Sequence, residues 1–102
     1  MIKIGLDNPT KTELLEAMQE ASLRLTADGC ESAEAINEGS CFEWATEVIS
    51  MVDCKIVARC HAGGYHCFIE YRRKFYDSET LDGIRQWQNL PYFKRCRAEG
   101  VV

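Results

Sequence analysis

The chain has 102 residues, 46% hydrophobic and 27% charged, a composition that excludes a disordered protein and predicts a single domain over residues 1–102. Its net charge of −4 argues against nucleic acid as the main partner, because phosphate binding needs a basic face. No run of about 20 apolar residues predicts a membrane span, and the first seven residues lack the apolar segment of a signal peptide. We therefore expect a cytoplasmic protein without a membrane partner.

The first predicted helix runs from Asn8-Pro9 to Asp28-Gly29. Proline is tolerated in a first turn, and Thr10 and Glu13 stand at the spacing of a capping box. Before this helix, residues 1–7 are expected to form a short strand or an irregular arm. Its apolar face recurs at three-and-four spacing: Leu14, Leu15, Met18, Ala21, Ser22 and Leu25.

A second helix is predicted after residues 30–40, which are small and acidic and are expected to include a helical turn. Ser40 is the candidate N-cap, and Glu43 and Glu47 lie near the positive N-terminal end, where acidic side chains are favoured. The apolar stripe of this helix is Trp44, Ala45, Val48, Ile49 and Val52.

The pattern changes from helical to strand-like after Asp53. Residues 54–60 alternate and carry β-branched side chains, so they predict a first strand, which Gly63-Gly64 interrupts. Residues 66–71 predict a second strand and residues 74–77 a third, which gives an antiparallel meander.

A tight turn at Arg72-Arg73 joins the second and third strands. Together with Lys74 these residues form the only dense basic run in the centre of the chain, which a solvated hairpin turn explains. Residues 78–87 are expected to form a loop and a short helix, with Pro91 near the end of this last segment. The order of helix, helix, meander and terminal helical piece predicts an α+β fold with segregated elements.

Cys41 stands in the first turn of the second predicted helix. Unpaired backbone N–H groups and the positive end of the helix dipole favour a thiolate there, lowering the pKa of the thiol from its ordinary value near ~8.5. Gly39 allows close approach of a substrate, and the backbone amide of Cys41 is a candidate oxyanion-hole donor. The alternative is a buried helix-start cysteine without reactivity.

His66 is predicted to share one face of the hairpin with two acidic residues. Pairing that runs back from a two-residue turn brings Glu79 roughly opposite His66 and Asp77 diagonal to it, since side chains alternate by two along each strand. A nucleophile, an imidazole that activates it and a group that orients the imidazole form the general triad arrangement. The chain order Cys, His, acid fits that arrangement. The alternative is a partly exposed histidine near a sheet edge.

Two segments together resemble a known family. Gly-x-Cys-x-x-Trp-Ala over residues 39–45, followed by His-Cys-Phe-Ile-Glu-Tyr-Arg-Arg-Lys-Phe-Tyr-Asp-Ser-Glu over residues 66–79, resembles small papain-like (NlpC/P60-like) proteins of phage and prophage origin. Those proteins share a Cys at a helix start, a His, a strand, a short turn and Tyr-Asp-(Ala/Ser)-Glu. Residues 81–93 also look like their tail, so the resemblance covers roughly residues 38–95.

The resemblance implies a papain-like fold, in which a Cys-bearing helix packs on an antiparallel sheet that carries the His, with a short C-terminal helix. Members with complete sites are thiol hydrolases of peptidase or amidase type, which often cut peptide or isopeptide bonds. Carried over by residue, Cys41 is the nucleophile, His66 the general base and Asp77 the orienting group, with Glu79 as the competing choice. Papain-type sites usually place a Gln before the Cys as an oxyanion donor; here Asn37 is the candidate, at a different spacing.

The same resemblance implies a peptide or amide substrate and no cofactor, and a host-cell cytoplasm if a phage encodes the chain. A competing hypothesis is a binding or inhibitor protein that keeps the fold without catalysis and contacts a host protein. Its candidate contact residues are Trp44, Trp87, Tyr92 and Phe93.

The six cysteines allow a further alternative. They would suggest three disulfides in a secreted chain, but in a reducing cytosol we expect mostly free thiols. Cys60, His61, His66 and Cys67 are potential ligands of a structural zinc, with Cys54 just upstream, and at most Cys60 or His61 could join His66 or Cys67 across the Gly63-Gly64 bend. The usual spacing of zinc-binding cysteines is absent, however, and adjacent residues of a strand face opposite sides.

Overall fold

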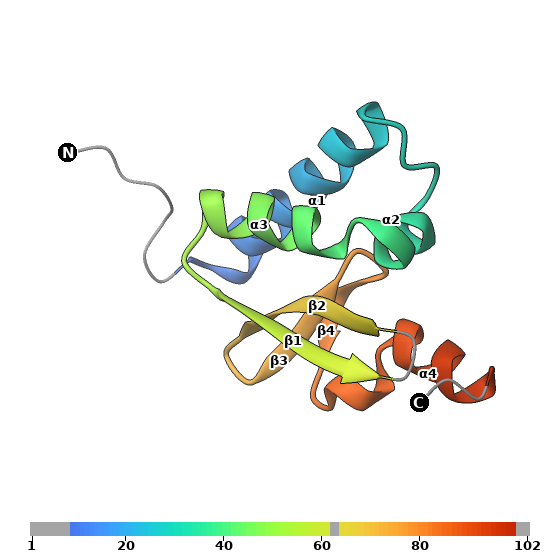
Figure 1. Ribbon diagram of the computed structural model, residues 1–102. Helices are drawn as coiled ribbons and strands as arrows, with labels where there is room; N and C mark the ends of the chain where they lie inside the picture. The colour runs from blue at the N-terminus through green and yellow to red at the C-terminus, as the bar shows by residue number, and fades with distance from the viewer. Residues whose placement is uncertain (1–8, 62–63, 100–102) are drawn as a thin grey trace.

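The computed structural model describes residues 9–61 and 64–99, which form four α-helices, a 3₁₀ helix and a four-stranded antiparallel sheet. The predicted α+β class is therefore confirmed, whereas the prediction for residues 1–7 lies outside the described residues. None of the described helices is long and apolar enough to cross a membrane. The elements are α1 (Lys11–Ala27), α2 (Ala33–Gly39), α3 (Cys41–Met51), β1 (Lys55–His61), β2 (Gly64–Tyr71), β3 (Lys74–Asp77), β4 (Thr80–Ile84), η1 (Trp87–Asn89) and α4 (Pro91–Ala98) (Figure 1).

The boundaries of α1 follow the sequence signals. Thr10 and Glu13 form the predicted capping box, in which each side chain accepts a hydrogen bond from the other residue's backbone N–H. The helix ends at Ala27 with Asp28 as its C-cap, and Gly29 adopts a φ of 113°, which only glycine reaches without strain. The buried face is Leu14, Ala17, Met18, Ala21 and Leu25.

Helix α2 is longer than the single turn that the sequence predicts. Ser32 caps it by accepting a hydrogen bond from the Ala35 N–H, and Ile36 and Asn37 are buried. Ser40 occupies the N-cap position of α3 as predicted, but its hydroxyl caps no amide and accepts a bond from the Cys30 thiol at 3.6 Å instead. The first-turn amides of α3 are therefore left without a side-chain cap from the described residues.

The sheet has the strand order β1-β2-β3-β4, with antiparallel neighbours. Tyr71 pairs with Lys74, as predicted, and the two-residue turn places both Arg72 and Arg73 at positive φ. The prediction that residues 78–87 form a loop and a short helix is wrong, because β4 pairs with β3 and α4 begins only at Pro91.

Strand β4 escaped prediction because its local pattern is weak. It contains Asp82 and Gly83, and none of its five residues is fully buried. Gly83 has a φ of 79°, and a β-carbon there would meet the buried Tyr76 ring at 2.5 Å. The strand is selected by its pairing with β3 and its contact with that ring rather than by its own propensity.

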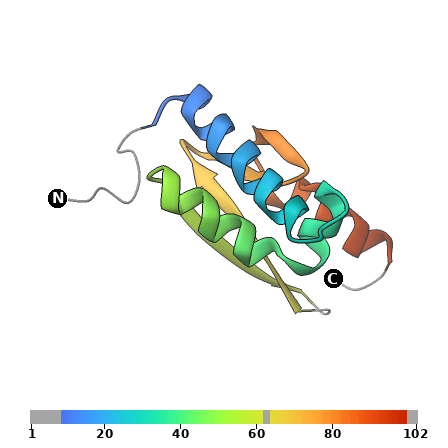
Figure 2. The ribbon, with the colours of Figure 1, turned by 90° about the horizontal axis from the view of Figure 1, so that it is seen from above.

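Two groups of apolar side chains cover the two faces of the sheet. Helices α1 and α3 lie side by side over one face (Figure 2), where they pack with α2 against Ile69, Tyr71 and Tyr76. The other face carries Val57 and Phe68, which pack with Leu90 and Phe93 from the α4 side. Because side chains alternate along β2, His66 shares the second face with Phe68.

Candidate active site

Cys41 opens α3 at the point where this helix meets the start of β2. Its thiol is half-buried, and its Sγ accepts a hydrogen bond from the backbone N–H of Cys67 at 3.4 Å. Burial raises the pKa of the Cys41 thiol, but the interactions with the His66 imidazole and with the Cys67 amide outweigh burial and lower it below its ordinary value. The site therefore favours a thiolate.

His66 is fully buried, with an exposed fraction of 0%. Its ring stacks on Tyr92, with centroids 4.2 Å apart, and meets the edge of Phe93 at 5.4 Å. Its Nε2 lies 3.1 Å from Oδ2 of Asp77, which is also fully buried. The ring is thus fixed by two aromatic residues of α4 and by one carboxylate of β3.

The two ring nitrogens of His66 have different roles. Asp77 accepts from Nε2, so the neutral imidazole carries its proton there and presents Nδ1 as a base. Nδ1 has no hydrogen-bond partner among the described residues. Burial lowers the pKa of His66, but the Asp77 carboxylate and then Cys41 raise it above its ordinary value. The paired shifts of Cys41 and His66 favour a thiolate–imidazolium pair.

The predicted position of Glu79 opposite His66 is wrong. Ile69–Tyr76 is the last β2–β3 pair in the direction of Asp77, and β3 ends at Asp77. Glu79 lies in the following turn, because Asp77 already pairs with Thr80. Its backbone N–H donates to Oδ1 of Asp77 at 3.0 Å, so the turn helps to hold the carboxylate that orients His66.

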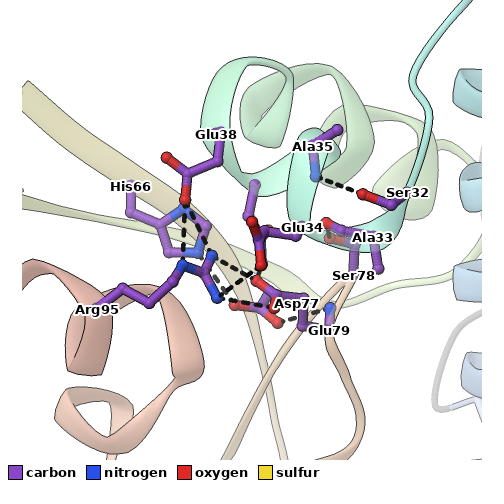
Figure 3. Close-up of polar contacts among 11 residues, drawn as sticks. Ser32, Ala33, Glu34, Ala35, Glu38, His66, Asp77, Ser78, Glu79 and Arg95 are labelled. Atoms are coloured by element: carbon purple, nitrogen blue, oxygen red, sulfur yellow. Dashed lines mark hydrogen bonds and ion pairs between the residues drawn. The ribbon is translucent and has the colours of Figure 1, made fainter.

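The Glu79 side chain joins a separate polar cluster. Arg95 of α4 binds it with two hydrogen bonds, of 2.9 and 2.8 Å, and also donates to Glu38 of α2 at 3.0 Å (Figure 3). Burial raises the pKa of Glu79, but Arg95 and Asn37 outweigh it and lower that pKa below its ordinary value. Of the two predicted acids, Asp77 is the one that contacts the imidazole.

Asn37 lies beside Cys41 on the wall of a cavity but is itself held by Glu79. Its Nδ2 donates to Glu79 Oε1 at 2.8 Å, and the residue is buried. The amide nitrogen carries a second hydrogen. Asn37 therefore lines the same cavity as Cys41, and its side chain is held by the same acid that binds Arg95.

A cavity of about 290 Å³ opens at Cys41. Two acidic residues and three aromatic residues stand around it. Phe42 and Tyr65 are 53% and 57% exposed, which is unusual for large hydrophobic side chains. The lining residues are Asn37, Glu38, Gly39, Cys41, Phe42, Glu43, Tyr65 and Tyr92.

The cysteines are free thiols in the structure, and three of them differ from Cys41 in the direction of their pKa shift. Burial, with a smaller effect of Asp53, raises the pKa of Cys54 to about 12. Burial and the neighbouring Cys41 raise the pKa of Cys67 to about 11, and burial raises that of Cys96. The environment of Cys41 therefore lowers the pKa of its thiol, whereas the environments of these three cysteines raise theirs.

The zinc alternative receives no support from the described part of the chain, where no three His, Cys, Asp or Glu side chains gather as a metal site. Cys60 is exposed, whereas Cys67 is buried and His66 is bound to Asp77. The side chain of His61 lies outside the described atoms.

The prediction that Trp44 and Phe93 are exposed to contact a partner protein is wrong. Trp44 and Phe93 are buried in the core, at 1% and 2% exposure. Trp87 and Tyr92 are partly buried and pack against the same core as Phe93. The exposed aromatic residues are instead Phe42 and Tyr65, whose polar or small neighbours in the sequence gave no periodic signal.

The contacts of Arg95, and those of Tyr92 and Phe93 over His66, could not be predicted from the sequence. Basic residues in the last turn of a helix are common, so Arg95 carried no signal of its own. The Tyr92-Phe93 pair after Pro91 was visible in the sequence, but its contact with His66 joins elements more than 25 residues apart.

Comparisons with protein-family models, with curated proteins and with solved structures found no match for this chain.

Proposed function

We propose that the protein is a papain-like thiol hydrolase that cleaves a peptide or other amide bond. The observation that carries the proposal is the buried His66–Asp77 hydrogen bond, which leaves Nδ1 as the basic nitrogen for Cys41. The lowered pKa of Cys41 and the raised pKa of His66 support the same pair. A purely structural histidine gains nothing from a half-buried thiol at a helix start beside it.

In the proposed mechanism, His66 Nδ1 takes the proton of the Cys41 thiol, and the thiolate attacks the acyl carbon of the substrate. The negative charge that develops on the acyl oxygen is stabilised by the Cys41 backbone amide and by the Asn37 side-chain amide. The amine leaves with the proton from His66, and water then hydrolyses the thioester with His66 as the base. Asp77 keeps the proton on Nε2 throughout.

The arrangement of the elements supports the papain-like part of the proposal. The Cys-bearing helix α3 packs on the antiparallel sheet whose strand β2 carries the histidine, and the short helix α4 closes the other face. The cavity beside Cys41 gives a peptide or amide group access to the sulfur. The mechanism needs no cofactor.

A non-catalytic binding protein is the second candidate. The observation that favours it is the exposure of Phe42 and Tyr65 at the cavity, because exposed aromatic residues are common anchors of protein interfaces. In that case the phage-type fold would dock on a host protein, and Cys41 would have no reactivity beyond that of an ordinary thiol.

Iodoacetamide alkylation at pH 6–7, followed by mass spectrometry of each cysteine, separates the two candidates. We expect Cys41 to react faster than the other five thiols and to lose that advantage in His66→Ala. The exposed Cys60 is the internal control, since its rate should be the same in both proteins. Buried Cys67 reports on the fold, because its protection persists only if the variant is folded.

Equal alkylation rates of Cys41 and Cys60 in the folded wild-type protein would refute the proposal that the protein is a thiol hydrolase.

A further inference from the structure

A cavity of about 330 Å³ at the β2–β3 turn is lined only by basic side chains: Arg72, Arg73, Lys74 and Arg85. The turn lies at the end of the sheet away from α4 (Figure 1). His66 and Arg72 are six residues apart along extended chain, a distance of about 20 Å. This basic cavity is therefore separate from the site of Cys41.

No carboxylate neutralises the basic cavity. Within residues 9–61 and 64–99, none of its four cations forms an ion pair. The Arg72 guanidinium lies over the Tyr71 ring at 5.0 Å instead, and Glu70 and Asp53 line the adjoining cavity without pairing with it. The chain has 16 acidic and 12 basic residues, so the missing ion pairs do not follow from a shortage of carboxylates.

The strand register adds repulsion to this cluster. Phe75 pairs with Ile84, the last residue of β4, and the same register continued by one residue would bring Lys74 opposite Arg85; both residues line the cavity. Like charges that face each other on neighbouring strands are destabilising. Neither of these two cations has an acidic partner among the described residues.

The residues of the β2–β3 turn are not those that its backbone conformation favours. Arg72 and Arg73 have φ values of 48° and 67°. Two-residue hairpin turns with two positive φ values favour Asn-Gly, because a long side chain with a β-carbon is disfavoured there. Positions where a chain departs from its local preference are expected at functional sites.

We propose that the basic cavity binds a small anion that carries a phosphate group. Guanidinium groups bind phosphate oxygens in pairs, and three of the four cations here are arginines. The cavity volume suits a small molecule. The net charge of −4 opposes an extended polyanion such as nucleic acid, which would also meet the acidic remainder of the surface.

The double substitution R72N/R73G tests the site without weakening the fold. Asn-Gly suits the turn, so the melting temperature is expected to stay the same or rise. Binding of inorganic pyrophosphate, measured by isothermal titration calorimetry at constant ionic strength, should weaken by about tenfold or more, because two charge-assisted contacts are lost. Loss of binding in a protein of equal or higher stability is not an effect of unfolding.

A matched pair of single variants controls for net charge. Arg85→Gln and Lys94→Gln each remove one positive charge, and Lys94 is an exposed residue of α4 outside the cluster. Pyrophosphate affinity should fall about tenfold in the first and less than about twofold in the second. The proposal is overturned if the wild-type protein does not bind pyrophosphate, if both variants lose equal affinity, or if only a single-stranded oligonucleotide binds.

Discussion

Among single residues, His66 is central to the candidate site, because its two ring nitrogens have different roles. Nε2 donates to a fully buried carboxylate, so the interaction is strong and little screened by solvent. Nδ1 has no hydrogen-bond partner among the described residues, so it is the nitrogen that can act as the base in the proposed reaction. Asp77 is therefore a positioning residue that fixes the tautomer and raises the pKa of the ring, while Cys41 and His66 carry out the proposed reaction.

Asp77→Asn tests this role of the carboxylate. Asp77 is the leading cause that raises the pKa of His66, so its loss should let burial lower that pKa. The imidazolium would then be lost at a lower pH and would stabilise the Cys41 thiolate less, and alkylation of Cys41 at pH 6.5 should slow by about tenfold. The measurement is the pH–rate profile of alkylation by iodoacetamide between pH 5 and 9.

The matched control is Asp82→Asn, which removes an exposed carboxylate of β4 that has no side-chain partner among the described residues. Its profile should coincide with that of the wild type. A wild-type profile in the folded Asp77→Asn protein would contradict the assigned role.

At the scale of elements, Arg95 connects α4 to α2 and to the β3–β4 turn. It binds Glu79, which in turn holds Asn37 and donates its backbone N–H to Asp77. The elements that carry the candidate oxyanion donor and the orienting acid are thus linked by one guanidinium. This connection explains why a residue without an obvious signal in the sequence matters to the geometry of the site.

Arg95→Met should destabilise the protein by about 1–3 kcal/mol at pH 7, because it leaves the partly buried Glu79 carboxylate without its main partner. The pKa of Glu79 is lowered in the folded protein, so its ion pair contributes fully above its ordinary pKa near 4.5. That contribution is lost as the pH falls through the lowered value. Urea unfolding at pH 7 and at pH 3 should therefore show a difference that shrinks with acidification.

The corresponding control is Arg24→Met. Arg24 pairs with Glu47 of α3 and with Glu20 of its own helix, but all three side chains are well exposed, so its loss should change stability much less than the loss of Arg95. An Arg95 variant as stable as the Arg24 variant at pH 7 would count against the linking role.

At the scale of the whole molecule, the sheet is covered on both faces, and the candidate site lies where the two layers meet. Helix α3 brings Cys41 from one side, whereas His66 belongs to the face that η1 and α4 cover. Phe93 is the buried residue of α4 that packs on both His66 and Phe68. The packing of α4 therefore shields the imidazole of His66 from solvent.

Phe93→Ala should cost about 3–5 kcal/mol of unfolding free energy, because it leaves a cavity in the second apolar group. It should also expose His66 to solvent and broaden the alkylation profile of Cys41. Denaturant unfolding followed by tryptophan fluorescence measures the first effect. Phe42→Ala is the control, since that side chain is 53% exposed and its loss should change stability by less than about 1 kcal/mol. Equal stabilities of the two variants would show that α4 contributes little to the fold.

The elements with strong local signals could be predicted from the sequence. The capping box of α1, the positions of α3 and β3, and the turn at Arg72-Arg73 follow from spacing and from residue type. These signals act within four residues of each other, so a single chain reveals them. The alternation along β2 and β3 also placed His66 and Asp77 on one face.

Which acid contacts the imidazole of His66, and which side chains cover it, depends on the packing of distant segments. The bend after Asp77 moves Glu79 into a turn, where Arg95 takes its side chain, and Tyr92 and Phe93 close over His66. These contacts join segments that are far apart in sequence, and their geometry depends on where β4 and α4 pack. Packing energy, rather than local propensity, selects those positions, so no pattern within one segment could reveal them.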